Sequence, residues 1–366
     1  MSFVPFQKEL PVHKLARIFN KTTNSYKFYW LLAIIHLIQR HPQKSHFKFK
    51  TIVEEMVILS WYPANYFKIS FGPSDQLRKL IYELSEQSGL IKPDSPKQLI
   101  RQEIRRLFNE NTEVKKSITN LTNFVPFRLL QPFFSADLKG EKDSSKNKKT
   151  LLLAKERFQD LKPLYQFNDN TDGIILHDSW RNYFLINFKI IEGFCLWHLA
   201  RFLQKKNPNT PNVNEKIISK PQRNSLNDAR KIWQDVIREN DLFCPFSEIK
   251  LGKDFHIDHY LPWSFVLHDQ IWNLIPINSR INSVKSNKIP DIQEHFTNYS
   301  EIQYTLLGYL LTNKKKKYLE DYVTNFHLNH QQLSALSEEG FSTKLHENIT
   351  PLAQLALNAG FEKLIL

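Results

Sequence analysis

One stretch of this chain, residues 255–290, concentrates the side chains that are best suited to chemistry. It reads FHIDHYLPWSFVLHDQIWNLIPINSRINSVKSNKIP, and its candidate residues are Asp258, His259, Asn273, Asn282 and Lys285. Imidazole has an unperturbed pKa near neutral pH, so the histidine suits the task of a general base. Carboxylate and amide oxygens suit Mg²⁺ or Mn²⁺, which bind one or two protein groups and keep several waters. Such a set can activate water and stabilise the charge that develops when a phosphodiester is hydrolysed.

The pattern around these residues predicts two strands and a short helix. We expect strands over residues 254–259 and 272–277, followed by a helix that Ser279 caps. Asn282 and Lys285 are three positions apart on that helix and share a face. Adjacent residues of a regular strand point to opposite faces, so the first strand must end or bulge at the Asp-His pair if both side chains serve one cation.

This pattern resembles the HNH nuclease family, whose fold is also called the ββα-metal or His-Me finger. Asp-His, an apolar residue, Pro, a loop, Asn-Leu and then Asn-x-x-Lys-Ser is the core of that family. The stretch is most similar to the variant in the RNA-guided CRISPR nucleases, which runs on to Ser-Asn-x-x-Pro, here Ser286, Asn287 and Pro290. The resemblance covers residues 244–290, and nothing elsewhere in the chain resembles the CRISPR proteins.

The resemblance implies a role for each candidate residue. His259 would be the general base, and Asp258 and Asn282 would be metal ligands. Asn273 would hold the histidine loop in place, and Lys285 would bind phosphate. These roles imply an endonuclease that hydrolyses DNA phosphodiester bonds, with Mg²⁺ or Mn²⁺ as its cofactor and double-stranded DNA as its partner.

The chain departs from the family where many members bind structural zinc. Those members frame the hairpin with two Cys-x-x-Cys pairs, whereas this chain has Cys-Pro-Phe-Ser at residues 244–247 and no second pair. A structural zinc is therefore not expected, and apolar packing must replace it. The aromatic candidates for this packing are Phe243, Phe246, Trp263 and Trp272.

A chain of 366 residues is expected to form two or three domains. We expect a mainly α-helical, α+β protein with a helical domain over residues 1–210. An HNH nuclease domain over residues 222–295 and a helical C-terminal region over residues 296–366 would follow. The Asn- and Pro-rich residues 207–221 are the expected boundary between the first two domains.

Within the first domain the patterns predict several local features. The apolar residues of 26–40 recur close to helical period, so a buried helix is expected there. Residues 139–150 hold five lysines and almost no apolar residue, which predicts a loop or linker. Residues 183–188 alternate enough to predict a short strand. A helix over residues 96–109 carries an arginine row, which we expect to be a solvated face. The row consists of Arg101, Arg105 and Arg106.

The formal net charge of +13 exceeds what a solvated surface requires. Lysine and arginine release condensed counterions when they bind phosphates, so this excess suggests a polyanion partner. Residues 1–210 are the candidate region for binding nucleic acid or a partner protein. A Lys-rich composition from an AT-rich genome explains the charge equally well, and both explanations stay open at this point.

The expected cellular compartment rests on three features that are not found in the sequence: a signal peptide, a membrane-spanning run and a disulfide framework. The N-terminal residues mix charge with apolar side chains and do not resemble a signal peptide. The most apolar run, residues 28–38, is shorter than the roughly 20 residues that span a bilayer. Two cysteines, Cys195 and Cys244, cannot build a disulfide framework. A reducing cytoplasm is therefore the expected location.

The expected cellular role rests on resemblance alone. Stand-alone bacterial HNH proteins with large unfamiliar flanks are similar to restriction enzymes and anti-phage effectors, so we expect defence against phage or plasmid DNA. The alternative is a nucleic-acid-binding subunit of a multi-protein defence complex, which cuts only when a partner activates it. One active site per chain breaks both DNA strands only in a homodimer or in two visits.

Overall fold

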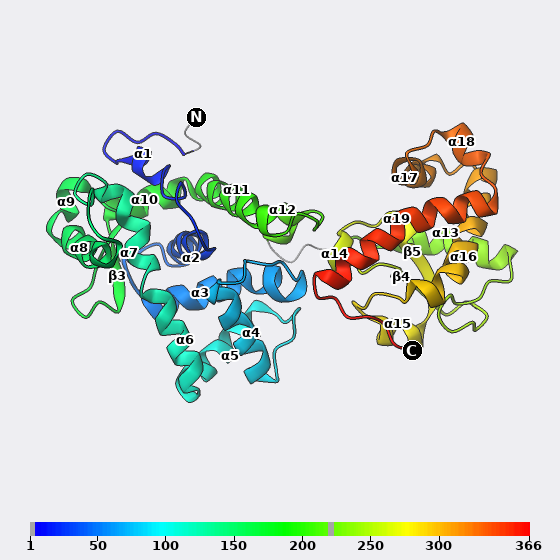
Figure 1. Cartoon of the computed structure of the whole chain (residues 1–366), viewed down its shortest axis with the longest axis horizontal. Helices are drawn as coiled ribbons and strands as arrows, with labels where there is room; N and C mark the ends of the chain where they lie inside the picture. Colours follow the sequence, from blue (N-terminus) through cyan, green and yellow to red (C-terminus); the bar gives the residue numbers. More distant parts are fainter. Residues whose placement is uncertain (1–3, 219–222) are drawn as a thin grey trace. The chain divides into compact units, whose positions relative to one another are not determined.

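The computed structural model describes residues 4–218 and 223–366. The chain forms two compact units (Figure 1). Unit 1 comprises Met1–Pro208 and Val213–Pro221, and unit 2 comprises Asn209–Asn212 and Gln222–Leu366. The predicted mainly α-helical, α+β class is confirmed. The predicted start of the nuclease domain, residue 222, lies outside the described residues. Across the described part of the chain, no helix combines the length and apolar character needed to cross a membrane.

Unit 1 is an assembly of helices with one small antiparallel sheet. Its helices are α1 (Val12–Leu15), α2 (Tyr26–Arg40), α3 (Phe49–Trp61), α4 (Gln76–Ser88), α5 (Lys97–Glu110), α6 (Thr112–Thr122), α7 (Val125–Leu130), α8 (Asp143–Glu156), α9 (Phe158–Leu161), α10 (Asp178–Ile186), α11 (Phe188–Lys206) and α12 (Val213–Lys216). Short turns of helix lie at η1 (Tyr62–Tyr66) and η2 (Gln131–Phe134). The strands are β1 (His46–Lys48), β2 (Tyr165–Phe167) and β3 (Gly173–Leu176), in the order β1-β3-β2.

Helix α2 is the centre of unit 1. It has the bounds predicted from its apolar pattern, and most of its side chains are buried. Helices α3, α7, α10 and α11 pack around it (Figure 1). The Trp30 indole on α2 donates a hydrogen bond to the Tyr165 hydroxyl at 3.1 Å, which ties the small sheet to this core.

Two local predictions in unit 1 are wrong. Residues 143–156 form α8 rather than a loop, because lysine is a good helix former and the helix needs only a narrow buried side, which Thr150 and Ala154 supply. Residues 183–186 belong to α10 rather than to a strand. Trp180, Tyr183 and Phe184 are buried at helical spacing, so the short alternating pattern was part of a longer 3.6-residue period.

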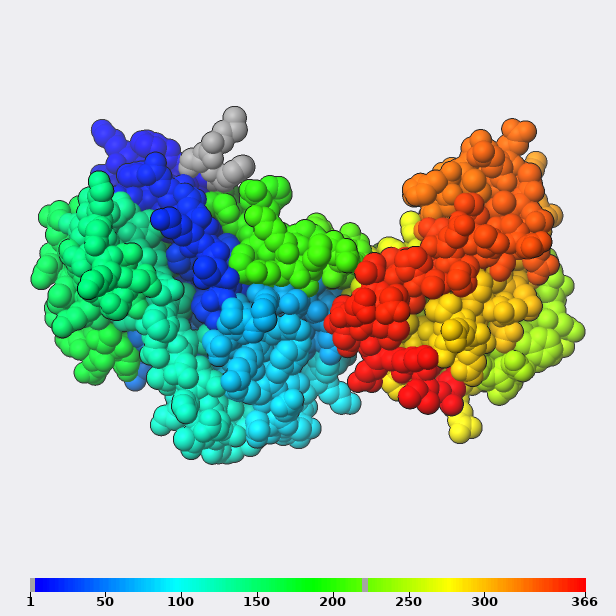
Figure 2. All heavy atoms as spheres, in the orientation of Figure 1, coloured from blue at the N-terminus to red at the C-terminus, as the bar shows by residue number. Residues whose placement is uncertain are grey.

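Unit 2 places a two-stranded hairpin among helices. Its elements are α13 (Asn227–Glu239), β4 (Phe255–His259), α14 (Trp263–Val266), η3 (Ile271–Asn273), β5 (Leu274–Asn278), α15 (Ser279–Lys285), α16 (Ile292–Thr312), α17 (Lys316–Phe326), α18 (His330–Ser334) and α19 (Glu338–Asn358). Helix α19 packs against α16 and α17 and lies at the surface of the unit (Figure 2). Hairpin and C-terminal helices share one hydrophobic core that includes Trp233, Trp272 and Tyr299.

The arginine row of α5 is not the solvated face that we expected. Arg101 donates to Glu54 at 2.7 Å and to Glu55 at 2.9 Å, and Arg105 donates to Glu54 at 2.9 and 3.0 Å. Both glutamates lie on α3 and are buried. Burial alone would raise the pKa of Glu55, but hydrogen bonds from Arg40 and Arg101 hold that pKa below its ordinary value. Arg101 and Arg105 therefore join an ion network between α3 and α5 whose glutamates are buried, whereas Arg106 pairs with Glu103 and Glu110 of its own helix.

Removing the arginine that bridges both glutamates should destabilise unit 1. We expect Arg101→Ala to lower the free energy of unfolding by about 3 kcal/mol, because it leaves buried carboxylates with one partner fewer. Lys155→Ala, which breaks an exposed pair with Asp169, should change it by less than about 1 kcal/mol. Urea unfolding at pH 7 measures both, and equal effects would contradict the network.

The same variant tests the pH dependence of the network. A carboxylate whose folded-state pKa is lowered contributes stability above its unfolded pKa, about 4.5 for Glu55. That contribution is lost as the pH falls through the folded-state pKa. The stability difference between wild type and Arg101→Ala should therefore be largest at neutral pH and shrink in acid. A difference that is constant from pH 7 to pH 3 would contradict this expectation.

Candidate active site

The predicted order of strand, strand and helix is present in unit 2. Strands β4 and β5 pair antiparallel, with Asp258 opposite Ile275 and His259 opposite Leu274. Helix α15 follows β5 directly, and Asn278, rather than the predicted Ser279, caps it by accepting the Arg280 N–H at 2.9 Å. We expected the first strand to end or bulge at the Asp-His pair, and strand β4 does end at His259.

Lys285 joins the helix to the end of the first strand. Its ammonium donates to Asp258 Oδ2 at 2.9 Å and to the His259 carbonyl oxygen at 2.5 Å. The Lys285 side chain is fully buried, and Asp258 is the carboxylate that balances its charge. The ammonium predicted to bind phosphate is thus engaged with the Asp-His pair itself, and its phosphate role stays a prediction.

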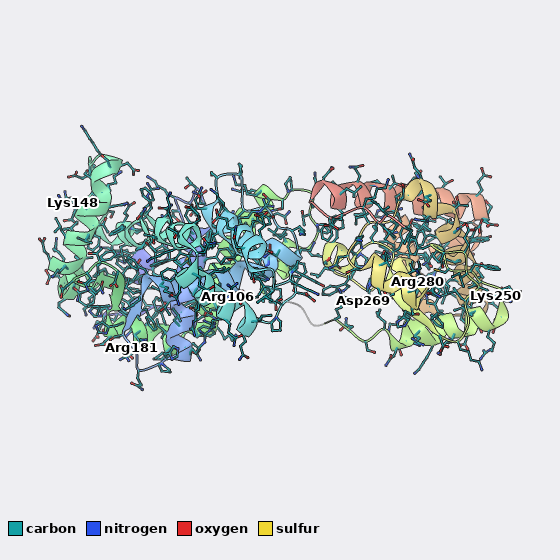
Figure 3. All side chains as sticks on the ribbon, turned by 90° about the horizontal axis from the view of Figure 1, so that it is seen from below. Arg106, Lys148, Arg181, Lys250, Asp269 and Arg280 are labelled. Atoms are coloured by element: carbon teal, nitrogen blue, oxygen red, sulfur yellow. The ribbon has the colours of Figure 1, made fainter. Side chains whose placement is uncertain are left out.

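His259 is held by a carboxylate that the sequence patterns did not indicate. Its Nε2 atom lies 2.8 Å from Asp269 Oδ1, and the ring is only 5% exposed. The hydrogen bond from His259 lowers the pKa of Asp269 against the opposing effect of burial. An ionised carboxylate only accepts hydrogen bonds, so Nε2 carries the hydrogen and Nδ1 of the neutral ring keeps its lone pair. Asp269 lies in the loop between the strands (Figure 3).

Asn273 closes that loop from within. Its side-chain oxygen accepts the Leu261 N–H at 2.8 Å, and its amide nitrogen donates to the Leu261 carbonyl at 3.0 Å. Its own carbonyl accepts the Tyr260 N–H at 2.7 Å, and the residue is fully buried. These contacts tie the chain just after His259 to the start of β5. These contacts favour the predicted role of Asn273 in holding the histidine loop, which stays a prediction.

Asn282 lies one turn before Lys285 on α15 and is partly exposed. Its side-chain amide makes no hydrogen bond to any described residue, and neither does Asp258 Oδ1. The structure therefore brings Asp258, His259 and Lys285 into contact, and no hydrogen bond joins the Asn282 side chain to them. In their chemistry, a carboxylate and an amide oxygen suit a hydrated Mg²⁺ or Mn²⁺, which keeps most of its waters. Within residues 4–218 and 223–366, no three His, Cys, Asp or Glu side chains gather as a closed metal cage would need.

Apolar packing surrounds the position where zinc-binding relatives carry their first cysteine pair. Buried Cys244 starts a turn in which its N–H donates to the Ile249 carbonyl at 2.8 Å. Phe246 is buried and stacks on Tyr260 with ring centroids 6.0 Å apart. Trp263 and Trp272 are buried as well. The inclusion of Phe243 among the packing candidates is wrong, because its side chain is 49% exposed on the outer side of the turn.

Helices α16 and α17 hold the segment that contains Asn273 from outside the hairpin. The Tyr299 hydroxyl donates to the Trp272 carbonyl, and the Gln303 amide donates to the Leu274 carbonyl at 3.0 Å. Asp321 accepts the Ile271 N–H at 2.8 Å. Burial raises the pKa of Asp321, and the hydrogen bond from Ile271 opposes that rise. None of these three side chains was predicted, since nothing in their local sequence links them to the hairpin.

The hairpin ends in Asp-His, is closed by a buried asparagine and is followed by a short helix with Asn and Lys, which is the order of elements that the sequence predicts. Residues 244–291 match the family model described as HNH endonuclease, so this part of the chain is an HNH endonuclease domain. Comparisons with curated proteins and with solved structures give no match.

Asn273→Ala should open the loop after β4. The substitution leaves the buried N–H and carbonyl of Leu261 without partners, and we expect local stability to fall by about 2–4 kcal/mol. Hydrogen–deuterium exchange of the peptide that contains residues 255–275 measures this opening. Asn278→Ala removes only the cap of α15 and should cost about 1 kcal/mol. Equal protection in the Asn273 variant and the wild type would show that Asn273 does not hold the loop.

Proposed function

We propose that this chain is a metal-dependent endonuclease that cleaves double-stranded DNA. The observation that carries the proposal is the arrangement at the end of β4. There the His259 ring is oriented by Asp269, while Lys285 joins Asp258 to the His259 backbone. In the proposed enzyme, His259 would be the base and Asp258 a metal-binding oxygen donor, on adjacent residues at the end of one strand of the HNH hairpin.

In the proposed reaction His259 is the general base. Its Nδ1 atom takes a proton from the attacking water, and Asp269 stabilises the imidazolium that results. Asp258 and Asn282 would hold Mg²⁺ or Mn²⁺, which when bound supplies positive charge to the phosphoryl oxygens. Lys285 fixes the direction of the Asp258 carboxylate, and Asn273 keeps the loop in the form that lets Asp269 reach the ring.

The proposed role is defence against foreign phage or plasmid DNA, in the cytoplasm, and it is supported only by resemblance to stand-alone HNH proteins. One contact supports the alternative, a subunit that cuts only when a partner protein activates it. Asp258 is already bound by Lys285, so a cation must share this carboxylate with an ammonium. Purified protein that nicks or linearises plasmid with Mg²⁺ or Mn²⁺ supports the autonomous enzyme. Binding without cutting supports the subunit.

His259→Ala should remove the chemical step and keep DNA binding. We expect cleavage to fall by at least about a hundredfold, the usual contribution of a positioned base. His330→Ala, on the exposed helix α18, should cleave like the wild type. Plasmid nicking measures cleavage, and a mobility shift in chelator measures binding. Unchanged nicking by His259→Ala would refute the assignment, and a chelator should abolish wild-type nicking.

Asp269→Asn should lower the rate without weakening substrate binding. The amide cannot stabilise the imidazolium, so we expect kcat to fall by roughly ten- to a hundredfold and KM to stay within about twofold. Steady-state cleavage of a labelled duplex separates the two constants. A change confined to KM would mean that Asp269 contacts substrate rather than positioning His259.

A further inference from the structure

The excess positive charge of this chain lies entirely in unit 1. Residues 1–221 carry 35 Lys and Arg against 20 Asp and Glu, a net charge of +15, whereas residues 222–366 carry 15 against 17, a net charge of −2. Residues 209–212 add no charge to unit 2. The unit that holds the HNH domain is therefore not the one whose charge attracts a polyanion. A uniformly Lys-rich composition does not explain this division.

Three cationic side chains of unit 1 lie on helices α3, α5 and α6, which pack against one another. Lys50 lies in the first turn of α3, Arg105 lies on α5, and Lys115 lies on α6. The Lys50 ammonium is 3.6 Å from the centroid of the Phe108 ring and 3.3 Å from Asn109 Oδ1. Burial lowers the pKa of Lys50, the charge of Glu54 opposes that shift, and the charges of Arg105 and Lys115 add to it. Lys50 is thus held by an aromatic ring and an amide oxygen rather than by a carboxylate.

The arginine of this cluster has a fixed orientation. Glu54, which is buried, binds Nε and Nη2 of Arg105, while the Arg105 side chain as a whole is 59% exposed. Its Nη1 atom has no hydrogen-bond acceptor among the described residues. A guanidinium held on one edge and open on the other loses little side-chain entropy when it binds an oxyanion.

Among the cluster residues, Arg105 is paired with Glu54, whereas the two lysines have no carboxylate of the described residues bound to them. Glu54 and Glu55 are bound by Arg40, Arg101 and Arg105, and Glu110 pairs with Arg106. Glu113, in the first turn of α6, is exposed. Neither Lys50 nor Lys115 forms an ion pair with a carboxylate in the described part of the chain. Their charges are available to an external anion.

We propose that Lys50, Arg105 and Lys115 form a phosphate-binding surface with which unit 1 holds the backbone of double-stranded DNA. The two unpaired ammonium groups and the open edge of the Arg105 guanidinium would bind successive phosphates and release the counterions condensed on the duplex. The inference rests on the proposed function for its choice of DNA as the polyanion. It assigns substrate binding to unit 1 and phosphodiester chemistry to the HNH domain of unit 2.

The test compares two full-length variants with the same change in net charge. Lys50→Gln with Lys115→Gln removes two charges from the cluster. Lys142→Gln, at the N-cap of α8, with Lys148→Gln, on α8, removes two exposed charges from the same unit. Binding of a fluorescent duplex oligonucleotide is measured by anisotropy in chelator over a range of salt concentrations. Circular dichroism melting of each variant checks that it is folded.

We expect the cluster variant to bind between about ten- and a hundredfold more weakly at ~0.1 M salt. The slope of log K against log salt should fall in magnitude by about 2, because each lost phosphate contact contributes about 0.9. The α8 variant should lose less than about threefold and keep the wild-type slope. If the double variant unfolds, Lys115→Gln alone alters one exposed side chain and should lower the slope by about 1.

Equal losses of DNA binding in the two variants, or no loss in either, would overturn the proposal that this cluster is the phosphate-binding surface. A structured RNA that displaces the duplex far more readily than unlabelled DNA does, and that depends on the same lysines, would overturn the choice of DNA. Plasmid cleavage by the wild type is scored separately. If the wild type cleaves plasmid and the cluster variant binds DNA as tightly as the wild type, the proposed surface is refuted and the proposed nuclease stands. If the cluster variant loses binding but the wild type does not cleave, the proposed nuclease is refuted and the surface stands.

Discussion

The buried ammonium of Lys285 is the contact on which the site depends. A lysine with no exposed surface must have its charge balanced and its donors satisfied, or the fold is strongly destabilised. Asp258 and the His259 carbonyl meet that need, and in doing so they fix α15 against the end of β4. Because Asn282 lies one turn earlier on the same helix, the contact also sets where that amide lies. One buried ion pair thus positions an oxygen donor on each of two elements.

The remaining geometry follows from how the loop between the strands is held. Asn273 binds both backbone groups of Leu261 from inside, and Asp321 binds Ile271 from α17. With both ends of the loop fixed, Asp269 can meet the His259 ring at hydrogen-bond distance. The C-terminal helices are therefore part of the framework of the site, although they lie outside the residues that match the HNH family model.

The sequence predicted what is local and left out what depends on packing. Asp258, His259 and Asn273 could be found because their order along the chain is itself the pattern, and α2 because its apolar period is long. Asp269 and Asp321 could not be found, since a carboxylate in a loop or on a polar helix face has no periodic signature. The error at residues 139–150 has the same physical cause. Helix α8 buries so few side chains that its lysines dominate the composition.

The unequal charges of the two units are consistent with the chemistry of the site. The Asp258 carboxylate is bound by Lys285, so the divalent cation proposed for this site would bind in competition with that ammonium. Further lysines and arginines around the hairpin would raise the local potential and weaken cation binding at the same carboxylate. In the proposed enzyme, a net charge of −2 in the half with the HNH domain and +15 in the other would let one protein attract DNA without repelling the metal ion that its site needs. The constraint also explains why the cationic cluster on α3, α5 and α6 is better placed in unit 1 than beside His259.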